Sequence, residues 1–109
     1  MANSDETYNG HANYETWCVS LWLNNEEGTY RHCRMLAREA TNAADDSSLV
    51  SDGIWTIEEA TRNLLADALR EFLDELNPTK NQSSVFQDLI TSALGRVDWH
   101  SVADGFLDE

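Results

Sequence analysis

The chain has 109 residues, of which 20 are acidic and 7 are basic, so its formal net charge at pH 7 is −13. A hydrophobic fraction of 41% with four tryptophans excludes a disordered acidic tail, and the length suits one domain around one core. The charge disfavours direct binding to nucleic acid or to anionic membranes, because both need Lys and Arg to meet phosphates, and it favours a basic protein as the partner.

A first helix is predicted to begin after Asn13, a good N-cap, and to end near Asn24. Before it, Asn9 and Gly10 are typical of a tight turn, and we expect residues 1–12 to form a partly ordered N-terminal arm. Apolar residues recur at helical spacing and form one stripe, which we expect to face the core. The stripe consists of Tyr14, Trp17, Cys18, Leu21 and Trp22.

A second helix is expected from about Asn25 to Ala44, with Cys33 and Ala37 facing inward. The polar segment from Thr41 to Gly53 is interpreted as the longest loop of the chain. A short pair of strands at residues 50–55 remains an alternative for part of this segment.

The third helix has the clearest boundaries, because Thr56 and Glu59 have the spacing of a capping box and Pro78 ends the segment. Its apolar residues define a wide face that we expect to be core. They are Ile57, Ala60, Leu64, Leu65, Ala68, Leu69, Phe72 and Leu76.

Two shorter helices are predicted to follow. Ser84 opens one of them and Gly95 closes it as the C′ residue, and Asp98 caps a last helix that contains Trp99 and Phe106. Patterns typical of strands are nearly absent. The predicted fold is therefore all-α, a compact bundle of about five helices that forms a single acidic domain over residues 1–109.

The negative charge is concentrated in the second part of the chain. Residues 1–43 hold six acids and three bases, whereas residues 44–109 hold fourteen acids and four bases. On the third helix, Asp67, Glu71 and Asp74 fall within about 60° of arc. Carboxylates on successive turns stand about 5–6 Å apart, close to the spacing of phosphates along a nucleic-acid strand.

We expect the partner-binding residues to lie on this helix face and in the acidic loop. A row of carboxylates can enter a basic groove that binds DNA or RNA, because such a groove recognises negative charge and shape rather than the sugar or the base. The alternative is a merely solvated helix face, as in proteins adapted to salt. The seven candidates are Asp67, Glu71, Asp74, Glu75, Asp45, Asp46 and Asp52.

Motifs of catalysis are missing from the sequence, which has no GxGxxG, GxxxxGK[ST], GxSxG or HExxH. His32 and Cys33, with Cys18 or His11, match no standard zinc spacing, and we interpret both cysteines as reduced. We therefore expect no enzyme activity, no cofactor and no metal. The first ten residues do not resemble a secretory signal and no apolar run reaches the roughly 20 residues of a membrane span, so we expect a cytoplasmic protein.

Two groups of side chains have alternative interpretations. Arg31, Arg34 and Arg38 form one strip of the second helix that can contact phosphate, but the sequence favours pairing with the chain's own carboxylates. The aromatic residues are expected to be mostly core, and exposure of Trp17 or Trp22 is the sign that would indicate a partner-binding surface instead.

Residues 8–17 have the pattern Y-N-G-x-x-N-Y-E-T-W, and residues 22–28 have the pattern W-[LI]-x-N-[DE]-E-G. With these two patterns the opening of the chain resembles a short acidic protein family of phages, plasmids and other mobile elements. The later chain is only loosely similar to that family, near Val97–Trp99. The resemblance implies a mobile-element origin and no catalytic residues. Small acidic proteins of such origin often resemble anti-CRISPR and anti-restriction inhibitors that imitate nucleic acid.

The sequence thus predicts a non-enzymatic anti-defence inhibitor from a phage or plasmid, whose partner is a CRISPR–Cas or restriction complex of the bacterial host cell. Its acidic surface is expected to block the nucleic-acid-binding channel as a DNA mimic. The alternative is an interaction adaptor that binds a host or phage protein through its tryptophan-rich N-terminal helices. A third interpretation, a regulator that contacts DNA through the arginine strip, is disfavoured by the charge.

Overall fold

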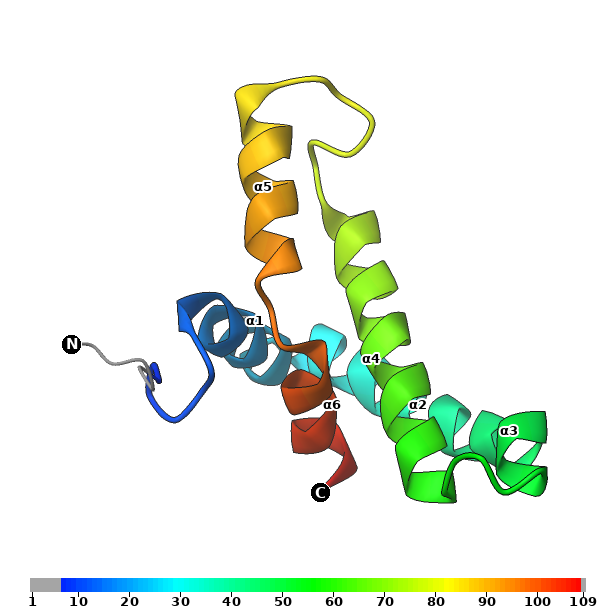
Figure 1. Cartoon of the computed structure of the whole chain (residues 1–109). Coiled ribbons are helices and arrows are strands. Elements are labelled where there is room, and N and C mark those ends of the chain that lie inside the picture. Colours follow the sequence, from blue (N-terminus) through cyan, green and yellow to red (C-terminus); the bar gives the residue numbers. More distant parts are fainter. Residues whose placement is uncertain (1–6, 109) are drawn as a thin grey trace.

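The computed structural model describes residues 7–108 and contains only helices within that range (Figure 1). The all-α prediction is confirmed, with one short helix more than expected. The elements are α1 (Tyr14–Asn25), α2 (Glu27–Asp45), α3 (Ser48–Ser51), α4 (Ile57–Leu76), α5 (Val85–Gly95) and α6 (Trp99–Leu107).

The predicted turn before α1 is confirmed. Asn9 and Gly10 have φ angles of 50° and 88°, and Tyr8 and His11 exchange backbone hydrogen bonds of 2.7 and 2.8 Å across them. A positive φ at two successive positions is the geometry for which Asn-Gly is favoured. Residues 1–6 of the expected N-terminal arm lie outside the described residues.

The core is built by α2, α4 and α6, and α1 covers α2 and α6. Leu65 and Leu69 of α4 are fully buried against Cys33 of α2 and Phe106 of α6. Small residues on α2, such as Ala37, let it cross α4 closely, and these two helices share the largest contact in the molecule.

The predicted N-caps are confirmed at four helices. Asn13, Ser84 and Asp98 each accept a hydrogen bond from the backbone N–H three positions later. Thr56 and Glu59 make both hydrogen bonds of the capping box, at 3.0 and 2.8 Å. These bonds satisfy donors that the first turn of a helix leaves without partners.

The predicted loop from Thr41 to Gly53 is wrong, because most of it is helical. α2 continues to Asp45, since Ala44 is fully buried, and α3 occupies four of the next residues with Ser47 as its N-cap. The alternative strand pair at 50–55 is also wrong for this described segment.

Two predicted boundaries shift slightly. α1 runs through Asn25, and Glu26 serves both as its C-cap and as the N-cap of α2. Hydrogen bonds from the hydroxyl and backbone N–H of Thr29 hold the pKa of Glu26 below its usual range. At the end of α5, Gly95 is still helical and Arg96 is the C-cap, two residues later than a C′ residue at Gly95 requires.

The predicted inward stripe of α1 is also wrong, because it faces away from the core. Tyr14, Leu21 and Trp22 are exposed, whereas Thr16 and Leu23 on the opposite side are buried. α1 is apolar on nearly all sides, so its periodicity does not select a face. The buried face of α1 is set instead by hydrogen bonds to the segment before α6. The backbone N–H of Asp98 donates one of them to the hydroxyl of Thr16 (2.9 Å).

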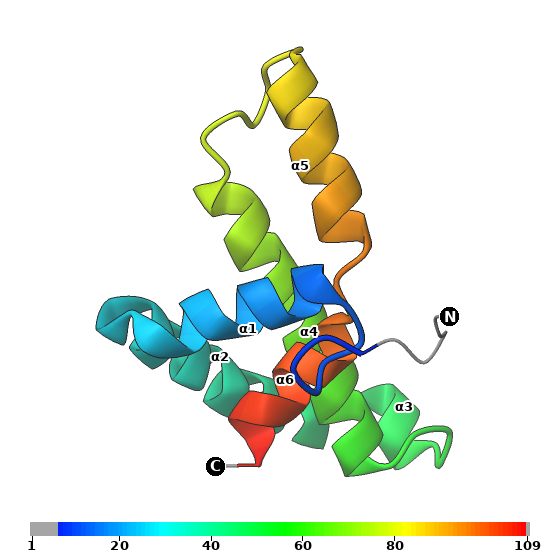
Figure 2. The same cartoon turned by 90° about the vertical axis from the view of Figure 1, so that its left-hand side faces the viewer.

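The core face of α4 is narrower than predicted. Ala60, Leu65 and Leu69 are buried, but Ile57, Leu64 and Leu76 are exposed. The arrangement of the helices explains the exposure of Leu76, since the C-terminal end of α4 projects from the body together with α5 (Figures 1 and 2). α5 contributes no buried residue, and Leu94 near its end is the side chain that packs against the core.

Candidate acidic interface

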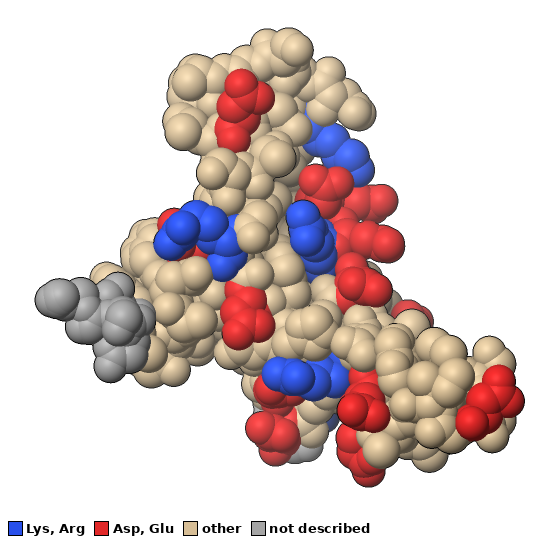
Figure 3. Space-filling view, in the orientation of Figure 1, with Lys and Arg blue, Asp and Glu red and all other residues tan. Residues whose placement is uncertain are grey.

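Four of the seven predicted partner-binding residues lie together on the C-terminal half of α4. Asp67, Glu71 and Glu75 follow one another at single-turn spacing and are exposed, and Asp74 beside them is half-buried. Figure 3 shows acidic side chains gathered along this part of the helix. We call these four residues the α4 acidic face.

The α4 acidic face is only partly neutralised. Lys80 Nζ lies 3.3 Å from Asp74 Oδ2, while Asp67, Glu71 and Glu75 have no ion pair among residues 7–108. Because both paired side chains are partly exposed to water, this single bridge screens Asp74 and leaves the negative field of the α4 acidic face in place.

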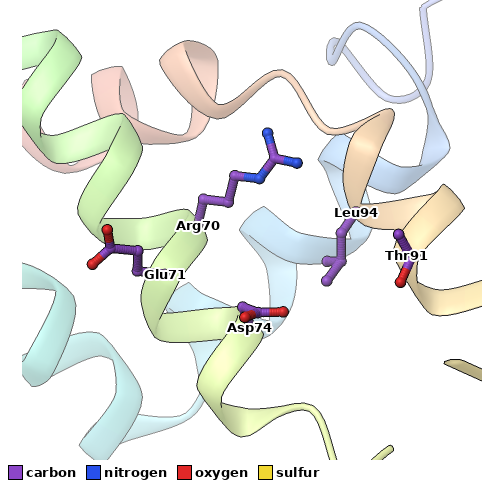
Figure 4. Close-up of a pocket in the computed structure, with 5 residues that line it drawn as sticks. All are labelled: Arg70, Glu71, Asp74, Thr91 and Leu94. Atoms are coloured by element: carbon purple, nitrogen blue, oxygen red, sulfur yellow. The ribbon is translucent and has the colours of Figure 1, made fainter. Parts of the chain in front are cut away.

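A groove with a volume of about 280 Å³ separates the acidic face from α5. Arg70, Glu71 and Asp74 line one side of it, and Thr91 and Leu94 line the other (Figure 4). The guanidinium group of Arg70 is directed away from both carboxylates in Figure 4, and Arg70 has no ion pair within the described range.

The other three predicted residues lie elsewhere. Asp45 ends α2, Asp46 is its C-cap and Asp52 is the C-cap of α3. The end of α2 and α3 both lie near the start of α4. Asp67 lies ten steps along α4 from its first residue, about 15 Å, and Glu75 lies eighteen steps along it, about 27 Å. The acidic surface is therefore divided into two separate parts.

Asp104 of α6, a further acid in the second part of the chain, is neutralised. Arg62 donates two hydrogen bonds to its carboxylate, of 2.9 and 3.1 Å, in a bidentate arrangement. The planar match of guanidinium and carboxylate makes a bidentate pair of this kind stronger than a single contact.

The arginine strip of α2 does not form a free cationic surface. Arg31 pairs with Glu27, as predicted from their spacing. Arg34 donates a hydrogen bond of 2.6 Å to the backbone carbonyl of Phe106 and is half-buried. Arg38 is exposed and has no ion pair within residues 7–108.

The histidines and cysteines do not converge on one point. His32 stacks on Phe72 with 4.3 Å between ring centroids, and burial raises the pKa of Cys33 to about 11, so its thiol stays protonated near neutrality. Cys18 is half-buried on α1. Among the described residues, no three His, Cys, Asp or Glu side chains are grouped so that they could hold a metal ion.

Sequence reasoning missed an exposed apolar surface on α1 and α5. The side chain of Trp22 is 68% exposed, and Phe86 and Leu89 of α5 are 65% and 62% exposed. The available signal was the scarcity of charge, since Glu15 and Asp88 are the only charged residues in these two helices. Charge scarcity alone is equally typical of buried helices, so it does not distinguish the two cases.

The fold and surface define a small acidic all-α protein. No helix in the part of the chain described here combines the length and apolar character that a membrane crossing needs. The chain belongs to DUF7249, a family of unknown function, which it matches over residues 4–93. No curated protein and no solved structure matched it. The family match includes α1 to α4 and almost all of α5, but it assigns no activity to any of them.

Proposed function

We propose that the protein is a non-enzymatic anti-defence inhibitor. In this role the α4 acidic face occupies the nucleic-acid-binding channel of a bacterial CRISPR–Cas or restriction complex. The observation that carries the proposal is the run of Asp67, Glu71 and Glu75 at single-turn spacing, exposed and without ion pairs within the described range. Their spacing of about 5–6 Å approximates that of successive phosphates.

The α4 acidic face lies on a helix that is fixed to the core. The opposite side of α4 is anchored by Leu65 and Leu69, both fully buried, so the carboxylates are presented without a large loss of backbone freedom on binding. The net charge of −13 adds a long-range field that accelerates encounter with a basic channel.

The test is charge reversal on the helix. The triple variant Asp67→Lys, Glu71→Lys and Glu75→Lys should weaken binding to the target complex by at least tenfold, because each change replaces an attraction by a repulsion. Lysine is a good helix former at exposed positions, and at position 75 in the last turn it also suits the helix dipole, so the helical circular dichroism should be unchanged.

The chain offers a matched control for this test. The triple variant Asp45→Lys, Asp46→Lys and Asp52→Lys changes the net charge by the same amount, also near helix C-termini, but at the other end of α4. The proposal expects a clearly smaller loss of affinity from this control. Equal losses from the two variants would mean that total charge, rather than the α4 acidic face, determines binding.

A second candidate function is favoured by one observation. The side chain of Trp22 is largely exposed, as expected for an adaptor that binds a host or phage protein through its N-terminal helices. Binding of that kind depends on apolar contact and should resist high salt, whereas channel blocking should weaken steeply as salt rises. Replacing Trp22→Ala while measuring affinity at two salt concentrations separates the two functions.

A further inference from the structure

The outward faces of α1 and α5 form a continuous apolar surface. The two helices border a groove of about 260 Å³, which is lined by Tyr14, Cys18, Val19, Ile90, Ala93 and Leu94 among others. Figure 2 shows α5 rising from one end of α1 on this side of the molecule. Beyond the groove, α5 continues as a free ridge formed by Val85, Phe86 and Leu89.

α5 lacks the packing that normally stabilises a helix of its size. It has 11 residues, none of them buried, whereas isolated helices shorter than about 12–15 residues are marginal in water. Exposed apolar residues of one helix that adjoin an apolar groove indicate a surface that is covered by another molecule.

The scarcity of charged residues on α1 and α5 limits which molecule can cover this surface. α4 has eight charged residues in twenty, whereas α1 and α5 together have only Glu15 and Asp88, and Glu15 is paired with Arg96 at 3.3 Å. A basic partner finds almost no anion here to recognise. Two chains that each carry −13 approach most readily through a face of this kind, where carboxylates are few and the one that lines the groove, Glu15, is paired.

We infer that a second copy of the chain covers this surface, with the α5 ridge of each copy inserted into the α1–α5 groove of the other. The ridge and the groove lie on the same molecule, so a two-fold arrangement fills both at once. In the views of Figures 1 and 3, α1 lies on the opposite side of the molecule from the acidic side chains along α4. The dimer therefore leaves both α4 acidic faces open.

The available area fits a stable dimer. Aromatic side chains carry roughly 150–250 Å² each and aliphatic ones less, so six residues that are 38–68% exposed offer on the order of 600 Å². A standard interface buries about 800 Å² on each partner. The six residues are Tyr14, Leu21, Trp22, Val85, Phe86 and Leu89.

The experiment is a mass measurement by light scattering on the full chain at high micromolar concentration. The wild-type protein should have twice the chain mass of 12.3 kDa. Phe86→Lys on the ridge and Tyr14→Glu at the groove should each give monomers, because each places a charge in both copies of the contact. A mixture of the two variants should regain the dimer mass, since one contact is then wild type and the other joins Lys to Glu.

A monomeric wild type overturns the inference, as does a dimer that survives Phe86→Lys, or a mixture that stays monomeric. Circular dichroism checks that the variants are folded, and Leu89→Lys is the replacement on the same ridge if Phe86→Lys is not. The triple lysine variant of the α4 acidic face should remain dimeric. The mass measurement thus tests the dimer separately from channel blocking, which is tested by binding of the triple lysine variant.

Discussion

The hydroxyl of Thr16 accepts a hydrogen bond of 2.9 Å from the backbone N–H of Asp98, although the two residues are 82 positions apart. Thr16 is fully buried, and its hydroxyl also donates to Asn13 Oδ1 at 2.7 Å. Asn13 in turn donates from Nδ2 to the backbone carbonyl of Arg96 at 2.8 Å. This network holds the first turn of α1 against the start of α6, and it turns the apolar stripe of α1 outward.

Replacing Thr16→Val should therefore destabilise the protein by about 1–3 kcal/mol, because it leaves a backbone N–H without its partner while keeping the side-chain volume. Urea unfolding followed by circular dichroism measures the change. Thr41→Val is the matched control, since the hydroxyl of Thr41 is exposed and bonds only within its own helix, to the carbonyl of Ala37. Equal stability of wild type and Thr16→Val would contradict this role.

Leu64 and Leu65 are neighbours on α4 that the sequence placed on one core face, and the structure separates them. Leu65 is fully buried and Leu64 is 37% exposed. Leu65→Ala should lower the free energy of unfolding by about 2–5 kcal/mol through lost burial and a cavity, and Leu64→Ala should lower it by clearly less. Chemical denaturation of both variants gives the comparison. Similar losses would mean that the face of α4 is rotated from the one described.

Burial raises the pKa of Cys33 to about 11 from an ordinary value of 9.0. Above pH 9 the thiol ionises in the unfolded chain but not in the folded one, so the unfolded state is favoured as the pH rises from 9 to 11. The contribution of Cys33 to stability should fall by about 1 kcal/mol between pH 8 and pH 10.

The measurement is urea unfolding at these two pH values for the wild type and for Cys33→Ala. The variant is expected to be less stable at both values because it leaves a cavity. Its loss of stability with pH should nevertheless be smaller than that of the wild type. Identical pH dependence in the two proteins would rule out this account of the buried thiol.

The sequence predicted the helices better than it predicted the faces that they bury. Caps such as Thr56 and Ser84 act locally, through hydrogen bonds within one turn, and their signals are readable in a single segment. The orientation of α1 depends on the contact between Thr16 and Asp98, which joins distant segments. The spacing of apolar residues within α1 cannot show which face is buried, and the face predicted from it was the wrong one.

For the candidate site too, features within one helix were predictable from the sequence, and those that depend on packing between helices were not. Asp67, Glu71 and Asp74 lie on one helix, and their spacing alone brings them together. Asp46 and Asp52 belong to other elements, so their distance from α4 depends on how α2 and α3 pack, which the sequence does not show. The exposure of Phe86 was unpredictable for the same reason, since an amphipathic pattern does not reveal whether its partner lies within the chain.

If the α4 acidic face competes with nucleic acid for a basic channel, the protein should displace a labelled guide or target strand from the purified defence complex. We expect the wild-type protein to displace the strand at low salt and to lose this ability as salt rises. The variant with lysine at 67, 71 and 75 should displace the strand only at much higher concentration. Binding of the protein to the complex without any displacement, or displacement that the triple lysine change leaves intact, would overturn the proposal.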